Sequence, residues 1–225
     1  MNLNVQPDTS VQDENASTAR RTQAERTAIS DAAMINAAID IIVARGTSGL
    51  TLKDVGEHAG YSRGLASYRF GSKSGLFAAI IRSVGESWLR ELQAATSNRQ
   101  GLDAVLAATD AHARLIAAGA PAIQAFYILW FNSIGPDHAL RQVIANVHER
   151  RQRDVEAWIQ SGLEHGNISP TVDIRAVAGQ FCATIVGIVY QWLARPDSLD
   201  DVMQLHDGLK AEMTSLLGLD ASSND

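Results

Sequence analysis

The chain of 225 residues has one cysteine, Cys182, which excludes a disulfide framework and a metal site built from several thiolates. It has no alternating polar and apolar runs of the kind that predict a set of strands, and no glycine-rich loop that would hold a phosphate. The first 20 residues are polar and acidic and lack the apolar stretch of a signal peptide, which predicts a cytoplasmic protein. We expect disordered ends at residues 1–18 and 219–225.

The sequence shows no catalytic or metal-binding pattern. No acid, base and nucleophile converge, so we predict that the protein is not an enzyme and uses no cofactor. The histidines form no metalloprotease pair, and we predict no metal site; they are His58, His112, His138, His148, His165 and His206.

Charge is distributed unevenly along the chain. The net charge of −6 at pH 7 is unexpected for a protein that binds nucleic acid. Residues 16–82, however, carry nine Lys or Arg against five Asp or Glu, whereas residues 83–225 carry ten against seventeen. A basic part on an acidic body is the asymmetry expected of a protein that contacts phosphate with one face.

Residues 51–73, TLKDVGEHAGYSRGLASYRFGSK, have the spacing of two short helices joined by a tight turn. Thr51 and Ser62 are placed to cap the first and the second helix. Gly60 and Gly71 are placed to end them, because glycine adopts the left-handed conformation at little cost. A second helix supported in this way, with its polar side outward, has the geometry that enters a DNA major groove.

This segment and the run MINAAIDIIVARG (34–46) resemble the helix-turn-helix of the TetR family of bacterial transcriptional regulators. The resemblance covers about residues 30–82 and rests on Thr51, Leu52, Val55, Ala59, Gly60, Ser62, Gly64, Phe70, Ser72, Lys73 and Leu76. The form GLASYRF is similar to that of the choline-responsive branch. The chain departs from the family pattern at Ser67, where tyrosine is common, at Arg69, where an aromatic residue or histidine is common, and at Gly75, which replaces a glutamate.

The resemblance implies an all-α protein of about nine helices with two domains. Residues 19–82 would form a three-helix DNA-binding domain, and residues 83–218 a larger helical domain for effector binding and dimerisation. The implied function is a ligand-responsive regulator, a repressor released from palindromic operator DNA by a small organic effector. A helical adaptor or a small-molecule-binding protein without DNA binding is the alternative.

The resemblance also implies a set of DNA contacts. Phosphate contacts are expected from Thr51, Lys53, Ser62 and from Lys73 at the start of the helix that Ser72 caps. Base contacts are expected from Arg63, Ser67 and Tyr68. The full predicted set is Thr51, Lys53, Tyr61, Ser62, Arg63, Gly64, Ser67, Tyr68, Arg69 and Lys73. A basic segment with Arg20, Arg21 and Arg26 leads into the first helix. It is either a solvated helix start or an arm that lies along the DNA backbone.

The pattern of the second half predicts six helices, at residues 73–95, 102–118, 122–133, 138–165, 172–195 and 198–217. Aromatic and polar side chains on the middle helices are either plain core or the lining of an effector pocket. The candidates are Trp88, His112, Gln124, Tyr127, Trp130, Phe131, Arg151 and Trp158, with Asn132 as a further polar group. Arg151 interrupts an apolar stripe and could pair with an anionic ligand or with a buried carboxylate.

The helix at 172–195 contains 19 successive residues without charge, a length that would permit a membrane span. Its polar residues Gln180 and Thr184 argue against a span, and we prefer a helix buried between its own core and a partner subunit. Small residues four apart on one stripe predict a homodimer contact through Gly179, Ala183, Gly187, Tyr190 and Gln191.

Gly60 to Gly64 match the G-x-S-x-G pattern of the hydrolase nucleophile elbow. That elbow needs a strand before the serine, and the residues before Ser62 predict a helix. The hydrolase interpretation is therefore disfavoured.

Overall fold

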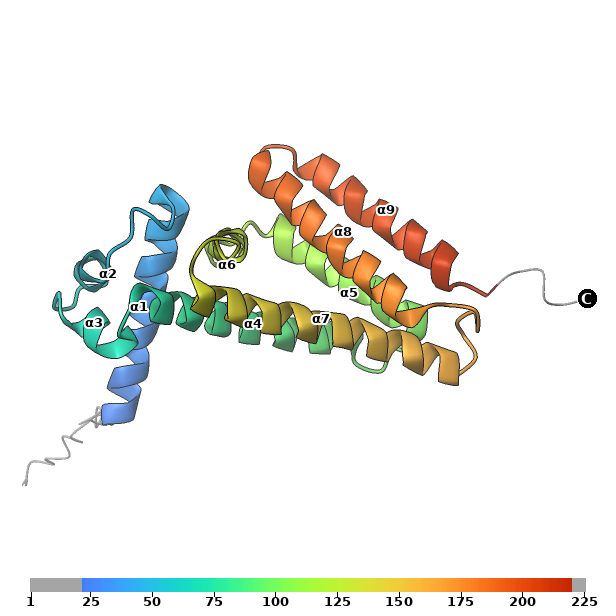
Figure 1. Ribbon diagram of the computed structural model, residues 1–225, viewed down its shortest axis with the longest axis horizontal. Coiled ribbons are helices and arrows are strands. Elements are labelled where there is room, and N and C mark those ends of the chain that lie inside the picture. Colours follow the sequence, from blue (N-terminus) through green and yellow to red (C-terminus); the bar gives the residue numbers. More distant parts are fainter. Residues whose placement is uncertain (1–21, 220–225) are drawn as a thin grey trace, which may run out of the picture.

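The computed structural model describes residues 22–219, which form nine α-helices and no strand (Figure 1). The helices are α1 (Gln23–Arg45), α2 (Leu52–His58), α3 (Leu65–Phe70), α4 (Lys73–Thr96), α5 (Gly101–Ala117), α6 (Pro121–Asn132), α7 (His138–Glu164), α8 (Ile174–Ala194) and α9 (Leu199–Leu217). The predicted all-α architecture is confirmed. The predicted arm at Arg20 and Arg21 lies outside the described residues. So do the predicted disordered ends, except for Leu219.

The first helix is longer than the family-like run 34–46. A capping box starts it at Thr22, whose hydroxyl accepts from the Glu25 amide at 3.2 Å while the Glu25 carboxylate accepts from the Thr22 amide at 2.7 Å. Arg26 therefore lies in the first turn of α1 and is not part of an approach ahead of it. The helix ends at Gly46, which has a φ of +71°.

The helices gather at two ends of an elongated molecule (Figure 1). The helices α1 to α3 form one end, and α5, α8 and α9 lie toward the other. α4 runs from the first group into the second alongside α7, and α6 packs on both α1 and α4. The domain boundary expected at residues 82–83 thus falls inside α4, which makes one continuous helix shared by both groups.

The turn between α2 and α3 differs from the prediction at Ser62. Thr51 caps α2 as expected, with its hydroxyl accepting from the Asp54 amide at 3.1 Å, and Gly60 has a φ of +77°. The α3 helix, however, begins at Leu65, and its N-cap is Gly64 without a side-chain cap. Ser62 lies in the preceding turn, where its carbonyl accepts from the Leu65 amide at 3.0 Å, so the prediction that it caps α3 is wrong.

The turn between α3 and α4 explains an unusual glycine. Gly71 ends α3 with a φ of +71°, and the Ser72 hydroxyl accepts from the Gly75 amide at 3.0 Å, which caps α4 as predicted. A Cβ added at Gly75 would collide with the carbonyl oxygen of Phe70. Close packing of the turn therefore accounts for glycine where the family carries a glutamate.

Two described helices, α1 and α8, are long and apolar enough to cross a membrane by length and composition alone. The bent pair of α5 and α6, which meet at 106°, would count as a third if it formed one span. In the fold α1 packs on α2, α4 and α6, and α8 packs on α7 and α9. The apolar residues of both helices thus contribute to the core of the molecule.

Candidate DNA-binding surface and ligand cavity

The α3 helix has a buried side and a polar exposed side. Ala66 is fully buried, and Leu65 and Phe70 pack against the core. Ser67 and Tyr68 point outward, and Tyr68 is 82% exposed. Seven of the ten predicted DNA contacts are exposed, namely Thr51, Lys53, Ser62, Arg63, Gly64, Ser67 and Tyr68, whereas Tyr61, Arg69 and Lys73 are half-buried.

Two arginines near α3 are engaged in ion pairs within the protein. Arg63 pairs with Glu57 of α2, and both side chains are largely exposed. Arg69 makes a two-point contact with Asp31 of α1, at 2.7 and 2.6 Å, and the hydrogen bond with Asp31 raises the pKa of Arg69. This pair ties α3 to α1, so a DNA contact by Arg69 would have to compete with it.

Lys73 occupies the first position of α4, where the unpaired backbone amides of the helix end carry partial positive charge. Its ammonium lies 5.8 Å from the centre of the Phe77 ring. Lysine and helix end together form a place where a phosphate would be stabilised.

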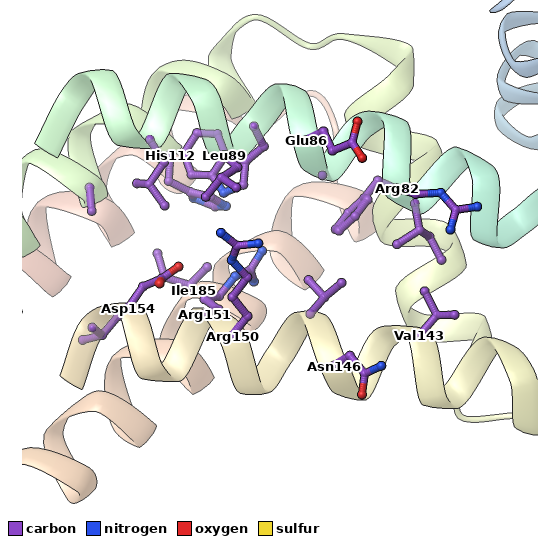
Figure 2. Close-up of a pocket in the computed structure, with 18 of the residues that line it drawn as sticks. Arg82, Glu86, Leu89, His112, Val143, Asn146, Arg150, Arg151, Asp154 and Ile185 are labelled. Atoms are coloured by element: carbon purple, nitrogen blue, oxygen red, sulfur yellow. The ribbon is translucent and has the colours of Figure 1, made fainter. Parts of the chain in front are cut away.

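A cavity of about 430 Å³ lies among α4, α5, α7 and α8 (Figure 2). Four of the predicted ligand residues line it: Trp88, His112, Arg151 and Trp158. Sequence reasoning missed four charged residues of the lining, Arg82 and Glu86 on α4 and Arg150 and Asp154 on α7. Glu86, Arg150 and Asp154 lie three or four residues from Leu89, Val147 and Trp158, which also line the cavity, and Arg82 lies four residues before Glu86; this spacing was a signal in the sequence.

The remaining predicted ligand residues, all on α6, are not part of the lining: Gln124, Tyr127, Trp130 and Phe131. Tyr127 and Trp130 support Arg151 instead, and the Phe131 ring lies 6.2 Å from that of Tyr190 of α8. Asn132 accepts a hydrogen bond from Thr47 at 2.9 Å, which links α6 to the loop after α1. Of α6, only Phe126 faces the cavity, because this short helix packs its aromatic side chains on several neighbours.

A chain of hydrogen bonds runs through the core beside the cavity. Nδ1 of His206 lies 2.8 Å from the Val202 carbonyl oxygen and therefore donates to it, which leaves Nε2 as an acceptor. Nδ1 of His112 then donates to that Nε2 at 2.9 Å, and Nε2 of His112 accepts from the Tyr127 hydroxyl at 3.1 Å. The Tyr127 oxygen accepts in turn from Nη2 of Arg151 at 3.3 Å.

This order of donors and acceptors is the one that two neutral histidines give. Burial lowers the pKa of His112 well below its ordinary value, and the nearby Arg151 charge lowers it further. Burial also lowers the pKa of His206. Within residues 22–219 no group of three or more His, Cys, Asp or Glu side chains could hold a metal ion.

The G-x-S-x-G pattern lies in the turn between two helices. The residues before Ser62 form α2, so the strand that a nucleophile elbow needs is replaced by a helix. Ser62 is exposed in this turn, beside the residues of the α3 surface.

The predicted dimer residues lie on the outer side of α8. Ala183, Gly187 and Tyr190 are exposed, and Gly179 and Gln191 are half-buried. A Cβ added at Gly179 or Gly187 would meet nothing within 4 Å, so this stripe of α8 is open in the single chain.

Comparison with known proteins agrees with this geometry. A family model described as bacterial regulatory proteins, tetR family, matches residues 34–80. The HTH-type transcriptional regulator BetI of Burkholderia ambifaria is 30% identical over 174 residues, which cover 72% of this chain and 79% of BetI. Two solved structures share the fold. The complex of SmeT from Stenotrophomonas maltophilia with triclosan has a TM-score of 0.72 at 17% identity, over 85% of this chain and 93% of SmeT. FadR from Bacillus subtilis in complex with stearoyl-CoA has a TM-score of 0.70 at 18% identity, over 82% of this chain and 97% of FadR.

A helix-turn-helix with an outward second helix, joined by one helix to a cavity-bearing body, defines a DNA-binding regulator. The chain belongs to the TetR family of bacterial regulatory proteins and is a transcriptional regulator. The resemblance in the 51–73 segment is thereby confirmed.

Proposed function

We propose that the protein is a cytoplasmic, dimeric repressor that leaves a palindromic operator when a small organic effector enters the cavity among α4, α5, α7 and α8. The observation that carries the DNA-binding part is the exposed polar side of α3 beside the N-terminus of α4. The cavity, with Trp88 and Trp158 in its lining, supports the effector part. SmeT and FadR, which share the fold, were solved with triclosan and stearoyl-CoA.

The DNA contacts divide into two roles. Lys73, Thr51 and Lys53 would bind phosphates and set the position of the protein on the duplex. Arg63, Ser67 and Tyr68 would reach base edges, and the exposure of Arg63 lets it exchange Glu57 for a base. For Arg69 we propose a positioning role, because its pair with Asp31 holds α3 against α1.

The dimer would form through the open stripe of α8 together with α9. Small side chains at Gly179, Ala183 and Gly187 let a helix of the partner come close. Two copies of α3 would then reach successive major grooves about 34–36 Å apart. An operator with inverted repeats follows from this symmetry.

Coupling between cavity and DNA would pass through α4 and α6. The α4 helix carries Lys73 at its start and lines the cavity from Ala78 to Leu92. The Thr47–Asn132 hydrogen bond, and a second of 2.5 Å from Ser74 to Asp137, join the DNA-binding end to α6 and to the start of α7. An effector that moves α4 would change the spacing of the two α3 helices, and operator DNA would weaken effector binding by the same factor.

Fluorescence anisotropy with DNA from upstream of the protein's own gene, against scrambled DNA, tests the proposal. Lys73→Ala should weaken binding to both DNAs similarly, whereas Arg63→Ala should weaken operator binding most, by about 1–3 kcal/mol. Arg99→Ala, an exposed arginine in the loop between α4 and α5, is the matched control and should change neither. Equal losses for Lys73→Ala and Arg63→Ala would reject the division of roles.

The alternative is a helical adaptor or small-molecule-binding protein that does not bind DNA. Wild-type protein that binds no DNA from its own upstream region at low salt would favour it. We propose no catalytic activity, metal or cofactor for the chain.

A further inference from the structure

Arg151 is the one arginine of the cavity whose guanidinium is held from several sides. It extends from α7 into the space between α7 and α4, on the side where His112 lies (Figure 2). Its Nη2 donates to the Tyr127 hydroxyl at 3.3 Å, and its guanidinium carbon lies 5.0 Å from the centre of the Trp130 ring and 6.0 Å from that of Tyr127. The hydrogen-bond chain through His112 and His206 orients the Tyr127 hydroxyl, so Arg151 is fixed in place.

The charge of Arg151 is not balanced by the described part of the protein. Its Nη1 is buried and has no hydrogen-bond partner. Within residues 22–219 no carboxylate oxygen lies within 4 Å of the guanidinium nitrogens of Arg151. Every ion pair found there joins other residues. A guanidinium remains charged at any pH that a protein tolerates, and a buried charge without a partner is destabilising. The sequence left two roles open for Arg151, pairing with a buried carboxylate or with an anionic ligand. Among the described residues the buried carboxylate is absent, which leaves the anionic ligand.

We infer that the cavity binds an organic anion, with a carboxylate at the Arg151 guanidinium and an aromatic or apolar body between Trp88 and Trp158. This inference rests on the proposed function and specifies its effector. A carboxylate in the cavity would balance the charge of the guanidinium that lines it, and charge-assisted pairing of this kind is stronger than a neutral hydrogen bond.

A cationic ligand, as the resemblance to the choline-responsive branch would suggest, fits this cavity poorly. A quaternary ammonium binds against aromatic faces, and one placed against Trp88 or Trp158 would share the cavity with the Arg151 guanidinium, which carries the same charge. The charged lining consists of three arginines, Arg82, Arg150 and Arg151, against Glu86 and Asp154. Burial raises the pKa of Asp154, one of these two carboxyl groups.

Titration calorimetry with three probes that share one ring system tests the inference: 2-naphthoate, 2-naphthamide and (2-naphthylmethyl)trimethylammonium. Naphthoate should bind the full-length protein about ten- to hundredfold more tightly than naphthamide, and the ammonium should bind most weakly. Equal affinity for the acid and the amide, no binding of naphthoate, or preference for the ammonium would each overturn the inference.

Two variants locate the anion. Arg151→Met keeps a long side chain without charge and should reduce naphthoate binding to the level of the amide. Arg153→Met removes an exposed arginine two residues further along α7, on another side of the helix and outside the cavity lining, and should leave both affinities unchanged. If Arg151→Met fails to fold, the acid–amide comparison on wild-type protein still decides. An unchanged preference for the acid in folded Arg151→Met would contradict the assigned site.

Failure of this inference is distinguishable from failure of the proposed function. Protein that binds operator DNA but does not prefer naphthoate would remain a repressor with an effector of another class. Protein that prefers naphthoate through Arg151 but binds no DNA would keep the anion site and lose the repressor assignment.

Discussion

The buried pair His112 and His206 makes the stability of the protein sensitive to mild acid. Both imidazoles are neutral in the hydrogen-bond chain, and burial lowers the pKa of each below the ordinary value of 6.5. In the unfolded chain each would take up a proton near pH 6.5, so the unfolded state binds more protons below that pH. The stability contributed by neutral burial is therefore complete above about pH 6.5 and is lost as pH falls toward the folded-state pKa values.

The size of the effect follows from the number of histidines. Each imidazole that titrates only in the unfolded state lowers the free energy of unfolding by up to about 1.4 kcal/mol per pH unit, so the pair contributes up to about 2.7 kcal/mol per unit. The effect at His206 should be the smaller one, because the Val202 carbonyl, Asp207 and Asp110 raise its pKa against the lowering by burial and by Lys210. A total stability of about 5–15 kcal/mol makes such a slope easily measurable.

Urea unfolding followed by circular dichroism at pH 7.5, 6.5, 6.0 and 5.5 measures the slope. Wild-type protein should lose little between pH 7.5 and 6.5 and progressively more below. His112→Gln and His206→Gln should each reduce the slope, whereas His165→Gln, at an exposed position after α7, should not. Constant stability from pH 7.5 to 5.5, or equal slopes in all four proteins, would refute the reasoning.

Three further predictions concern Gly162, which is closely packed, Gly187, which is open in the single chain, and Cys182, which is buried. Gly162→Ala should lower the free energy of unfolding by about 1–3 kcal/mol in urea melts, because the added Cβ would lie 2.6 Å from Cα of Gly101 and 2.5 Å from Cδ1 of Ile168. Unaltered stability would show that α5 and α7 can separate there. Gly187→Arg should leave helicity unchanged, because this position is open in the single chain, but the long side chain should block the proposed dimer contact and shift sedimentation from dimer to monomer. A dimer that persists would show that the interface does not include Gly187. Cys182 should react with a thiol reagent at pH 8 only after unfolding, because burial raises the pKa of its thiol to about 11, and rapid reaction of the folded protein would contradict that burial.

Much of the fold was predictable from local signals. Six helices after residue 72 were expected within two residues of their observed ends, because apolar periodicity and breaker residues report on the chain nearby. Thr51 and Ser72 cap their helices as predicted, since capping also needs only neighbouring residues. The capping box of Thr22 and Glu25 is equally local, and it starts α1 ahead of Arg26, which was expected to precede the first helix.

The candidate sites were less predictable because they depend on residues distant in the chain. Four of the eight predicted ligand residues line the cavity, while the aromatic residues of α6 turned mostly to other neighbours. Periodicity shows that a helix has an apolar side, but which helix covers that side is a property of the packed molecule. The sequence pattern of the charged residues on α4 and α7 is equally compatible with a solvated helix face, because it does not show that the two helices face each other.

What the sequence by itself determined is the class of protein: an all-helical chain with a helix-turn-helix near its start, because short-range spacing and turn residues specify those elements. Only the tertiary structure decided the roles of individual charges. It brought Asp31 to Arg69 across 38 positions and His206 to His112 across 94, and among residues 22–219 it left no carboxylate within 4 Å of the Arg151 guanidinium. Electrostatic partners are chosen by distance in space, and that distance is set only when the helices have packed.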